Sequence, residues 1–280
     1  MSEEVTIASV SEPGTRAGLA QDLRRLGLAP GGVMLVHSSL SSLGWVNGGP
    51  VAVIQALQDV LTEEGTLVMP AHSSGNSDPA FWENPPIPES WHETVRSTMP
   101  LYDPQRTPTR GLGQVAELFR TWPDVLRSAH PQMSFAAWGK QARYITEGHE
   151  LAFGLGDSSP LARVYDLDGH VLLIGAGYDS NTSLHLAEFR APDPRLTTSG
   201  APWIENGKRI WKTFPEIDFQ DDVFPDIGRD FESERDVRIG KVAAADCRLM
   251  SQRELVDFAT TWIAARRLLK PGGSSQTGQG

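Results

Sequence analysis

The sequence has too little of several residue types to belong to some common protein classes. It holds a single cysteine, Cys247, so an intramolecular disulfide and a cysteine-ligated zinc ribbon are both excluded. No apolar run approaches the about 20 residues that a membrane-spanning helix needs, and the most apolar stretch covers only 171–177. The first ten residues carry early acidic residues and no long apolar run, which is unlike a signal peptide. We therefore expect a cytoplasmic protein with no membrane partner.

Basic residues are also scarce. Lys and Arg together number 25 against 35 Asp and Glu, which gives a formal net charge of −10. Such a chain has little positive charge with which to neutralise phosphates, so we expect no nucleic-acid partner. The surplus of carboxylates instead favours neutral or cationic small molecules as partners. With 39% hydrophobic and 21% charged residues among 280, the chain has the composition of a folded protein.

Hydrophobic periodicity predicts an α/β domain. The apolar run Val33–His37 is typical of a buried strand, and Val51–Leu61, with Pro50 before it, carries one apolar helical face. A second short apolar run follows at Thr66–Met69. Strand, helix and strand with short links form a βαβ unit, which implies a parallel pair. Further strands are expected at 170–177 and 208–214, and further helices between Thr15 and Gly27 and at 113–122, 161–165, 181–189 and 251–270.

The segment 70–112 interrupts this pattern. It contains eight prolines, which excludes regular helix and central strand. Loops this long are usually functional or disordered, and the two tryptophans Trp82 and Trp91 favour an ordered one. At the two ends of the chain we predict a flexible segment over 1–14 and a disordered Gly/Ser/Gln-rich tail over 271–280, so that the folded domain covers 15–270.

The first candidate site follows the strand that His37 ends. Ligands of parallel sheets bind beyond the carboxyl ends of the strands. The Ser/Gly-rich loop 38–49 can aim backbone N–H groups at an anion, and the helix after Pro50 adds the positive end of its dipole. The alternative is that the serines satisfy the backbone of a turn and that His37 is a buried, hydrogen-bonded histidine.

The second candidate is the pair His185 and Glu188, again on a helix that follows a strand. A spacing of three residues places both side chains on one helical face. A carboxylate can hold an imidazole in one tautomer and stabilise its protonated form, which is what a general base requires. The alternative is an exposed ion pair worth a few tenths of a kcal/mol.

Other motifs are weaker or absent. Arg110 lies beside the start of a helix, where it would suit a phosphate, although a capped and exposed turn explains it as well. Seven histidines occur without the usual ligand spacings, so we expect no metal. The sequence contains no Gly-x-Ser-x-Gly motif, which argues against an α/β-hydrolase.

Acidic and aromatic residues share two segments of the chain. Carboxylates of this kind are usually a solvated face, but together with aromatic rings they are typical of a cleft for a cationic, sugar-like ligand. The candidate substrate-binding residues are Asp78, Trp82, Glu83, Trp91, Tyr102, Asp103, Asp218 and Phe224.

Several long stretches of the sequence are distinctive: LVHSSLSSLGWVNGG, MPAH, NPPIP, MPLYDPQRTPTRGLG, RSAHPQMSFAAWGK and SPLARVYDLDGHVLLIGAGYDSNTSLHLAEFR. In this order, between about residues 15 and 268, the chain resembles the antibiotic N-acetyltransferase family, that is, the aminoglycoside 3-N-acetyltransferases and their relatives. The resemblance implies a single α/β domain whose central sheet, partly parallel and mixed, is flanked by helices. This fold differs from that of the GNAT acetyltransferases.

The resemblance also implies an activity and a set of site residues. The activity is transfer of an acetyl group from acetyl-coenzyme A to an amine of an aminoglycoside, typically the 3-amine of deoxystreptamine. His185 is implied as the catalytic base with Glu188 as its partner, and His37 would touch the reacting thioester. The residues implied at the coenzyme A site are His37, Ser38, Ser39, Leu40, Thr109, Arg110, Gly111, Ser134, Phe135 and Ala136.

We hypothesise direct transfer in a ternary complex. His185 would take a proton from the attacking amine, and backbone N–H groups near Ser38 and Ser39 would steady the oxyanion. Alternatives are the same chemistry on another small amine, sequestration of a cationic antibiotic without catalysis, and hydrolysis of acyl-thioesters. The protein is expected to be a monomer or a homodimer.

Overall fold

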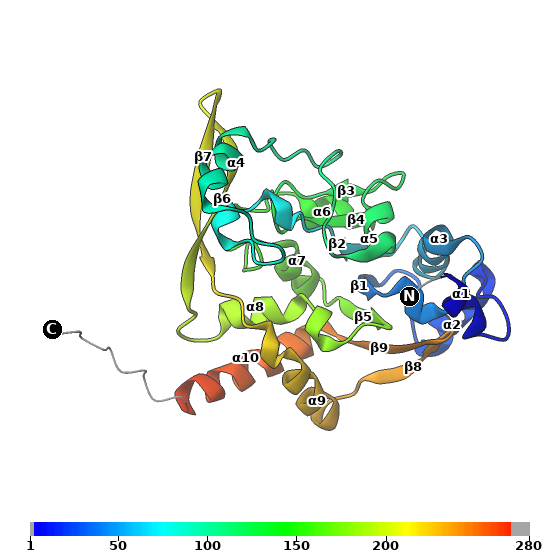
Figure 1. Cartoon of the computed structure of the whole chain (residues 1–280). Coiled ribbons are helices and arrows are strands. Elements are labelled where there is room, and N and C mark those ends of the chain that lie inside the picture. The colour runs from blue at the N-terminus through cyan, green and yellow to red at the C-terminus, as the bar shows by residue number, and fades with distance from the viewer. Residues whose placement is uncertain (1–2, 270–280) are drawn as a thin grey trace.

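A seven-stranded mixed sheet forms the centre of the protein (Figure 1), as a computed structural model describes it over residues 3–269. The three central strands β2, β1 and β5 run parallel, and the strands outside them are antiparallel to their neighbours. The mixed sheet expected from the resemblance is therefore confirmed. In spatial order the strands are β3 (Leu126–Arg127), β4 (Phe135–Gly139), β2 (Thr66–Pro70), β1 (Val33–Ser38), β5 (His170–Ile174), β9 (Ala245–Ser251) and β8 (Arg238–Val242).

Helices cover both faces of the sheet, because the side chains of each strand alternate between two cores. In β1, Met34 and Val36 belong to one core and Leu35 to the other, and β5 alternates in the same way. The first core is closed by α2 (Arg16–Leu26), α3 (Gly49–Leu61) and α5 (Gly113–Phe119). The second core is closed by α6 (Ala142–Thr146), α7 (Pro160–Asp166), α8 (Ser183–Arg190), α9 (Phe224–Glu234) and α10 (Gln252–Leu269).

Local signals in the sequence place several of these elements correctly. Thr15 caps α2 by accepting a hydrogen bond from the Gly18 amide, and Gly27 ends the helix in the left-handed conformation. Pro50 occupies the first turn of α3, where its missing N–H costs nothing. The strand expected at 170–177 is shorter, because the chain turns at Gly175 with a φ of 58°.

Other elements differ from the sequence-based expectation. The segment 70–112 holds one α-helix, α4 (His92–Thr98), so the prediction of no regular helix was wrong over this stretch, which contains no proline. The helix α9 was not among the predicted elements; it begins at Phe224, with a proline in its first turn. Strands β4 and β9 were not predicted; in β9, polar residues interrupt the apolar positions.

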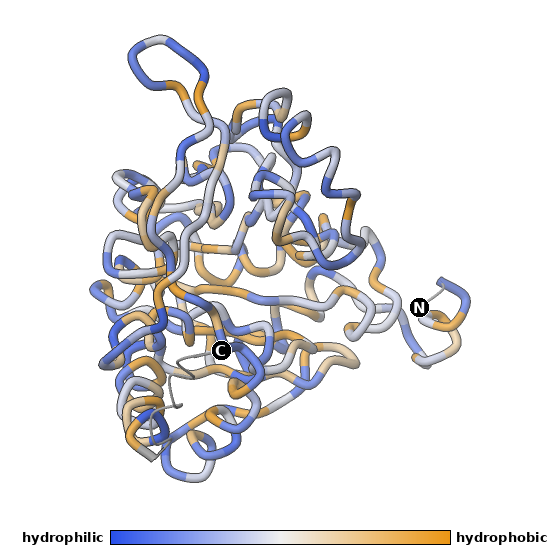
Figure 2. The backbone as a smooth tube through the Cα atoms, turned by 60° about the vertical axis from the view of Figure 1, so that its left-hand side comes forward, coloured by the Kyte–Doolittle hydropathy of each residue, from blue (hydrophilic) through white to orange (hydrophobic). Residues whose placement is uncertain are grey.

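A two-stranded hairpin stands apart from the central sheet, formed by β6 (Leu196–Glu205) and β7 (Lys208–Ile217). It extends past the body of the molecule, and its tip is hydrophilic (Figures 1 and 2). The helix α4 packs against the hairpin near its tip, where Arg209, paired with Ile204 beside the turn, donates hydrogen bonds to the carbonyls of Arg96 and Met99.

The N-terminal segment contains α1 (Glu3–Ala8), which has no buried residue. Trp45 Nε1 donates a hydrogen bond to Glu3 Oε1 at 3.0 Å. The flexibility predicted for 1–14 and the domain limits 15–270 stay predictions, and the tail 271–280 lies outside the described residues. Within 3–269, none of the helices combines the length and the apolar character needed to cross a bilayer.

Candidate active site

A cavity of about 1050 Å³ opens at the carboxyl ends of the parallel strands. Three segments contribute most of its lining: residues of 36–41 after β1, of 111–114 at the start of α5, and of 175–182 between β5 and α8. The first turn of α3 adds Gly49 and Pro50. The cavity thus lies where an open α/β sheet usually binds its ligand, with helix N-termini directed at it.

His37 lies at the end of β1, on the wall of this cavity. Its side chain is buried, and Nε2 lies 3.4 Å from Thr182 Oγ1. Burial, together with a smaller effect of the nearby His185, lowers the pKa of His37 to about 3. His37 is therefore a neutral imidazole at physiological pH. It is buried, as the structural interpretation of the sequence expected, and it also lines the cavity, as the functional interpretation expected.

The loop after His37 offers backbone donors to the cavity, at positions slightly different from those predicted. The Ser39 amide donates to the carbonyl of Ile174 at 2.9 Å, so this amide is not free to donate to a ligand. The short 3₁₀ helix Leu40–Leu43 follows, and the first N–H groups of a helix have no partner within it. Among the described residues, the amides of Leu40 and Ser41 donate to no backbone carbonyl. These two residues line the cavity, so their amides are candidate donors to a ligand.

His185 and Glu188 form a pair on α8 in which the imidazole is partly buried and the carboxylate buried. His185 Nδ1 lies 2.7 Å from Glu188 Oε2, and the carboxylate is only 3% exposed. The other oxygen, Oε1, accepts a hydrogen bond from the Gln220 amide at 2.7 Å. We assign the imidazole proton to Nδ1, because the carboxylate can only accept, and this leaves the Nε2 lone pair free. The alternative of an exposed surface pair is excluded by this burial.

Aromatic rings fix the orientation of His185. Phe219 and Phe224 pack against the imidazole, with ring centroids 4.5 and 4.9 Å away. The helix itself begins where the sequence indicated, because Asn181 Oδ1 accepts a hydrogen bond from the Ser183 amide. The arrangement of carboxylate, imidazole and free lone pair is that of a general base.

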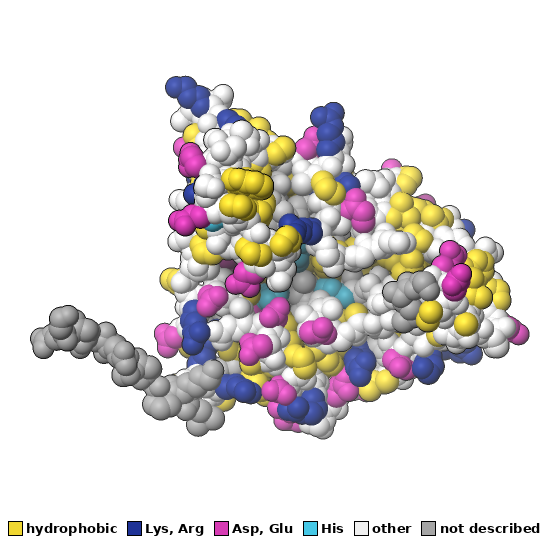
Figure 3. Space-filling model, in the orientation of Figure 1, with side chains coloured by type: hydrophobic (Ala, Val, Ile, Leu, Met, Phe, Trp, Pro, Cys, Tyr) yellow, Lys and Arg dark blue, Asp and Glu magenta, His cyan; other side chains and the backbone are white. Residues whose placement is uncertain are grey.

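A third histidine, which the sequence reasoning did not single out, belongs to this site. His72 follows β2, which is the neighbour of β1 in the sheet, as β5 is on its other side. Both His37 and His185 act electrostatically on His72. Figure 3 shows histidine side chains at the floor of a hollow in the middle of this face. The signal in the sequence was a histidine just after the second strand of the βαβ unit.

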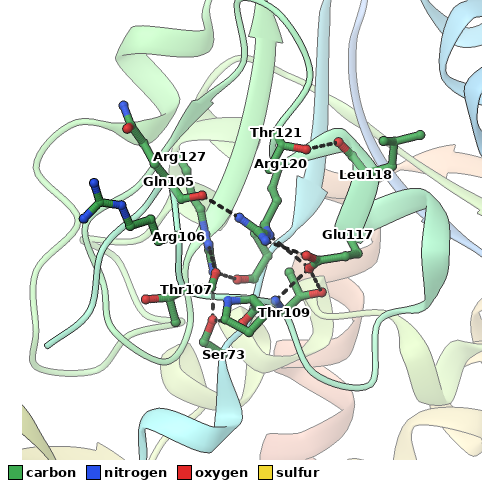
Figure 4. Close-up of polar contacts among 12 residues, drawn as sticks. Ser73, Gln105, Arg106, Thr107, Thr109, Glu117, Leu118, Arg120, Thr121 and Arg127 are labelled. Carbon is green, nitrogen blue, oxygen red and sulfur yellow. Dashed lines mark hydrogen bonds and ion pairs between the residues drawn. The ribbon is translucent and has the colours of Figure 1, made fainter. Parts of the chain in front are cut away.

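The segment that carries Arg110 is held by a polar network (Figure 4). Thr109 donates to Glu117 Oε2 from both its amide and its hydroxyl, and Arg120 pairs with the same carboxylate. Burial alone would raise the pKa of Glu117, but these hydrogen bonds lower it to about 2. The Arg110 amide donates to the His72 carbonyl, and Gly111 lines the cavity with a φ of 79°. The Arg110 side chain is exposed and reaches the Asn84 carbonyl at 3.3 Å.

Three residues predicted at the coenzyme A site are absent from the lining of the cavity. Ser134, Phe135 and Ala136 have no exposed surface. Ser134 Oγ donates to the Ala71 carbonyl, and β4 pairs with β2. Their side chains therefore have no surface to offer a ligand, and their place in the coenzyme A site stays a prediction. Phe224, predicted to bind the substrate, is likewise fully buried, with its ring against His185.

The other predicted substrate residues divide into paired and free groups. Asp78 pairs with Arg96 at 2.7 Å, Asp103 accepts hydrogen bonds from its own turn, and Tyr102 Oη donates to the Ser128 carbonyl. These side chains have partners within the protein, and their contact with a substrate stays a prediction. Trp82 donates to Ser77 Oγ. The side chains of Glu83, Trp91 and Asp218 are exposed.

Metal ligation was also considered for the described part of the chain. Between residues 3 and 269, no three His, Cys, Asp or Glu side chains come together in a way that could hold a metal ion. The prediction that the reaction uses no metal stays a prediction.

Known proteins resemble this chain over most of its length. The model of the aminoglycoside 3-N-acetyltransferase family matches residues 35–264. The SPbeta prophage-derived aminoglycoside N(3′)-acetyltransferase-like protein YokD of Bacillus subtilis (strain 168) is 52% identical over 92% of this chain and 95% of its own.

Solved structures are also similar to this chain. The crystal structure of YokD superposes with a TM-score of 0.94 at 49% identity, covering 96% of this chain and 100% of that one. The structure of AAC-IIIb in a binary complex with CoASH has a TM-score of 0.80 at 33% identity, covering 91% and 98%. A single-residue mutant of aminoglycoside acetyltransferase AAC(3)-IVa in complex with gentamicin has a TM-score of 0.78 at 32% identity, covering 93% and 92%. The resemblance read from the sequence is confirmed, and the chain belongs to the aminoglycoside 3-N-acetyltransferase family.

Proposed function

We propose that the protein transfers an acetyl group from acetyl-coenzyme A to an amine of an aminoglycoside, the 3-amine of deoxystreptamine, and thereby confers resistance. The observation that carries the proposal is the His185–Glu188 pair, which leaves one imidazole nitrogen free to accept a proton. Membership of the family supports the substrate class, because its relatives are named for this transfer.

The cavity of about 1050 Å³ is the proposed coenzyme A site. Its size suits a long ligand, and the N-terminal turn of α3, together with Arg110 near the start of α5, suits the phosphates. The structure of AAC-IIIb with CoASH supports this assignment by similarity. Neutral His37, on the cavity wall, would lie against the thioester without adding a charge there.

The transfer itself is proposed to be direct, within a ternary complex. The amine nitrogen attacks the acetyl carbonyl carbon while His185 Nε2 takes up one of its protons. The amides of Leu40 and Ser41 donate to the carbonyl oxygen as negative charge develops there. The carbon–sulfur bond then breaks, and the thiol leaves with the proton that His185 held. Glu188 stabilises the imidazolium while His185 holds the proton. General acid–base catalysis of this kind contributes about 10²-fold or more in rate.

Acidic side chains are proposed to attract the cationic acceptor. Figure 3 shows acidic residues gathered below the hollow in which the histidines lie. Asp218 is exposed and adjoins Phe219, the ring that packs on His185. Negative charge at the mouth of a cleft raises the local concentration of a polycation. Glu83 and Trp91, both exposed, are proposed to contribute to the same binding surface.

The test is thiol release from acetyl-coenzyme A with gentamicin-, kanamycin-, neomycin- and apramycin-type acceptors, followed by mapping of the acetylated amine. We expect thiol release that depends on the aminoglycoside and a product acetylated at the 3-amine. Release without any acceptor would indicate a thioester hydrolase, and activity only with simple amines would indicate another substrate. Tight aminoglycoside binding without release would indicate sequestration. Each of these three results overturns the proposal.

His185→Ala tests the general base. We expect turnover to fall by about 10²–10⁴-fold, because proton transfer loses its acceptor. Binding of acetyl-coenzyme A should stay within about twofold, since His185 is absent from the lining of the cofactor cavity. Turnover like that of the unmodified protein would refute the assignment. The cytoplasmic location and the monomeric or homodimeric state stay predictions.

A further inference from the structure

Three adjacent parallel strands each bring a histidine to the same end of the sheet. His37 lies in β1, His72 follows β2, and His185 lies on the helix after β5. The first lines the cofactor cavity and the third is the proposed base. The second has no role in the mechanism described above, although His185 and His37 both act on it electrostatically.

The backbone holds His72 firmly in place. The Ala71 amide donates to the Ser134 carbonyl, the Ser73 amide donates to the Gln132 carbonyl, and the His72 carbonyl accepts from the Arg110 amide. Its ring meets the edge of Phe135 with centroids 5.1 Å apart and planes at 83°. A ring fixed in this way is pre-organised to offer its polar atoms to a ligand, because little side-chain entropy remains to be lost.

The two ring nitrogens of His72 differ. Nε2 is buried and has no hydrogen-bond partner in the described structure, whereas Nδ1 is not among the buried, unpartnered atoms. Burial lowers the pKa of His72 to about 3, so the ring is neutral and carries a single N–H. A buried N–H without an acceptor costs more than a buried lone pair without a donor. We therefore assign the proton to Nδ1, the nitrogen that can be reached.

His72 shares with His185 its absence from the lining of the cofactor cavity. The residues that line the cofactor cavity include His37 but neither His72 nor His185. An aminoglycoside presents ammonium and hydroxyl groups. An N–H donor cannot bind an ammonium group, whose own hydrogens need an acceptor, but it can donate to a hydroxyl oxygen.

We propose that His72 is an acceptor-binding residue, whose Nδ1–H donates a hydrogen bond to a hydroxyl oxygen beside the reacting amine. The inference rests on the proposed acetyl transfer to an aminoglycoside. In this proposal the residue after β2, His72, recognises the sugar, His185 acts on the amine, and His37 faces the cofactor.

Three substitutions separate this role from packing. His72→Asn keeps an amide near the position of Nδ1, whereas His72→Gln moves the amide toward the position of Nε2. His72→Phe keeps a ring against Phe135 but removes every donor. For each variant, kcat and KM are measured for the aminoglycoside and for acetyl-coenzyme A, with thermal unfolding and acetyl-coenzyme A binding as checks on folding.

The expected loss is that of one neutral hydrogen bond, which corresponds to a 3- to 10-fold change, on the order expected for such bonds. His72→Phe and His72→Gln should lower kcat/KM for the aminoglycoside by about this factor, and His72→Asn should retain it within about twofold. The KM for acetyl-coenzyme A should not change. Between two aminoglycosides that differ by one hydroxyl, the unmodified protein should discriminate and His72→Phe should not.

Two results would overturn the inference. The first is an unchanged aminoglycoside kcat/KM in both His72→Phe and His72→Gln. The second is an equal loss in all three variants for both substrates, which would indicate packing. If His72→Phe does not fold, the comparison of Asn with Gln decides alone. If the unmodified protein acetylates no aminoglycoside, the proposed function fails and this inference with it. Activity in that protein with unchanged variants refutes only the role of His72.

Discussion

Replacing Glu188 by glutamine tests the link between burial and catalysis most directly. The Glu188 carboxylate accepts two hydrogen bonds, from His185 Nδ1 at 2.7 Å and from the Gln220 amide at 2.7 Å, and its side chain is 3% exposed. An amide of the same size can accept only one of them, because its NH₂ group must face the other donor. The imidazole can relieve this clash by moving its proton to Nε2, which is the nitrogen that must accept the proton of the substrate.

The magnitude follows from the bond that is lost. A hydrogen bond to a charged group contributes about 1.5–3 kcal/mol, which is roughly 10- to 150-fold in rate if it forms fully in the transition state. The change of tautomer adds to this loss. We therefore expect Glu188→Gln to lower kcat by about 10²–10³-fold, with the KM for acetyl-coenzyme A within about twofold of its original value.

The assay is thiol release under saturating acetyl-coenzyme A and aminoglycoside, with Asp157→Asn as the matched control. Asp157 pairs with Arg190 on the same helix, α8, at 2.8 Å, but its side chain is 59% exposed. The control removes a carboxylate that pairs with α8 without touching His185, so its kcat should be unchanged. A Glu188→Gln variant that retains more than about a third of the original kcat would refute the reasoning, because a buried charge beside His185 would then be dispensable.

Three further predictions concern stability. Four histidines have pKa values lowered to about 3 or 4 by burial, below the 6.5 of an unfolded histidine; they are His37, His72, His130 and His149. Between pH 6.5 and 3 the unfolded chain therefore binds more protons than the folded protein. The free energy of unfolding should be highest above pH 6.5 and should fall toward pH 3, by up to about 1.4 kcal/mol per pH unit for each histidine. Urea unfolding at pH 7.5, 6.5 and 5.5 measures this, and a flat profile would contradict it. Glu117→Gln should cost about 1 kcal/mol at pH 7, after discounting for the 40% exposure of the carboxylate. Because the pKa of Glu117 is lowered to about 2, that difference should vanish as the pH falls from about 4.5 toward 2, and urea midpoints at pH 7 and 3.5 would show whether it does. Gly139→Ala should cost about 2–4 kcal/mol of unfolding free energy, because its Cβ would lie 2.2 Å from the Gly65 carbonyl oxygen at a φ of 100°. Gly31→Ala, also at positive φ but with nothing within 4 Å, should cost about 1 kcal/mol, and equal losses would refute the steric argument.

Local features were readable from the sequence because they depend on neighbours along the chain. The cap at Thr15, the turn at Gly27 and the proline that starts α3 each act within one helical turn. The βαβ unit was readable from apolar periods, since a strand buried on both faces is a short apolar run. Strand β9 escaped prediction because polar residues interrupt its apolar positions, and only its pairing with β5 and β8 makes it a strand.

The roles of acidic residues could not be predicted in the same way. Asp78 and Glu188 are both carboxylates near aromatic residues in the sequence, yet Asp78 pairs with Arg96 while Glu188 holds a histidine. The difference is the identity of the partner, which for Asp78 lies 18 residues away along the chain. The spacing of residues along the sequence does not predict such a partner, because irregular loops bring the two side chains together.

The sequence by itself determined the family, the parallel centre of the sheet and the His185–Glu188 pair, because long motifs and a spacing of three residues on a helix are local properties. Only the tertiary structure decided which donors face the cavity, which predicted residues lie in the core, and that His72 lies near His37 and His185. The physical reason is the order β2–β1–β5: three strands far apart in the chain are neighbours in the sheet, and their ends meet at one place.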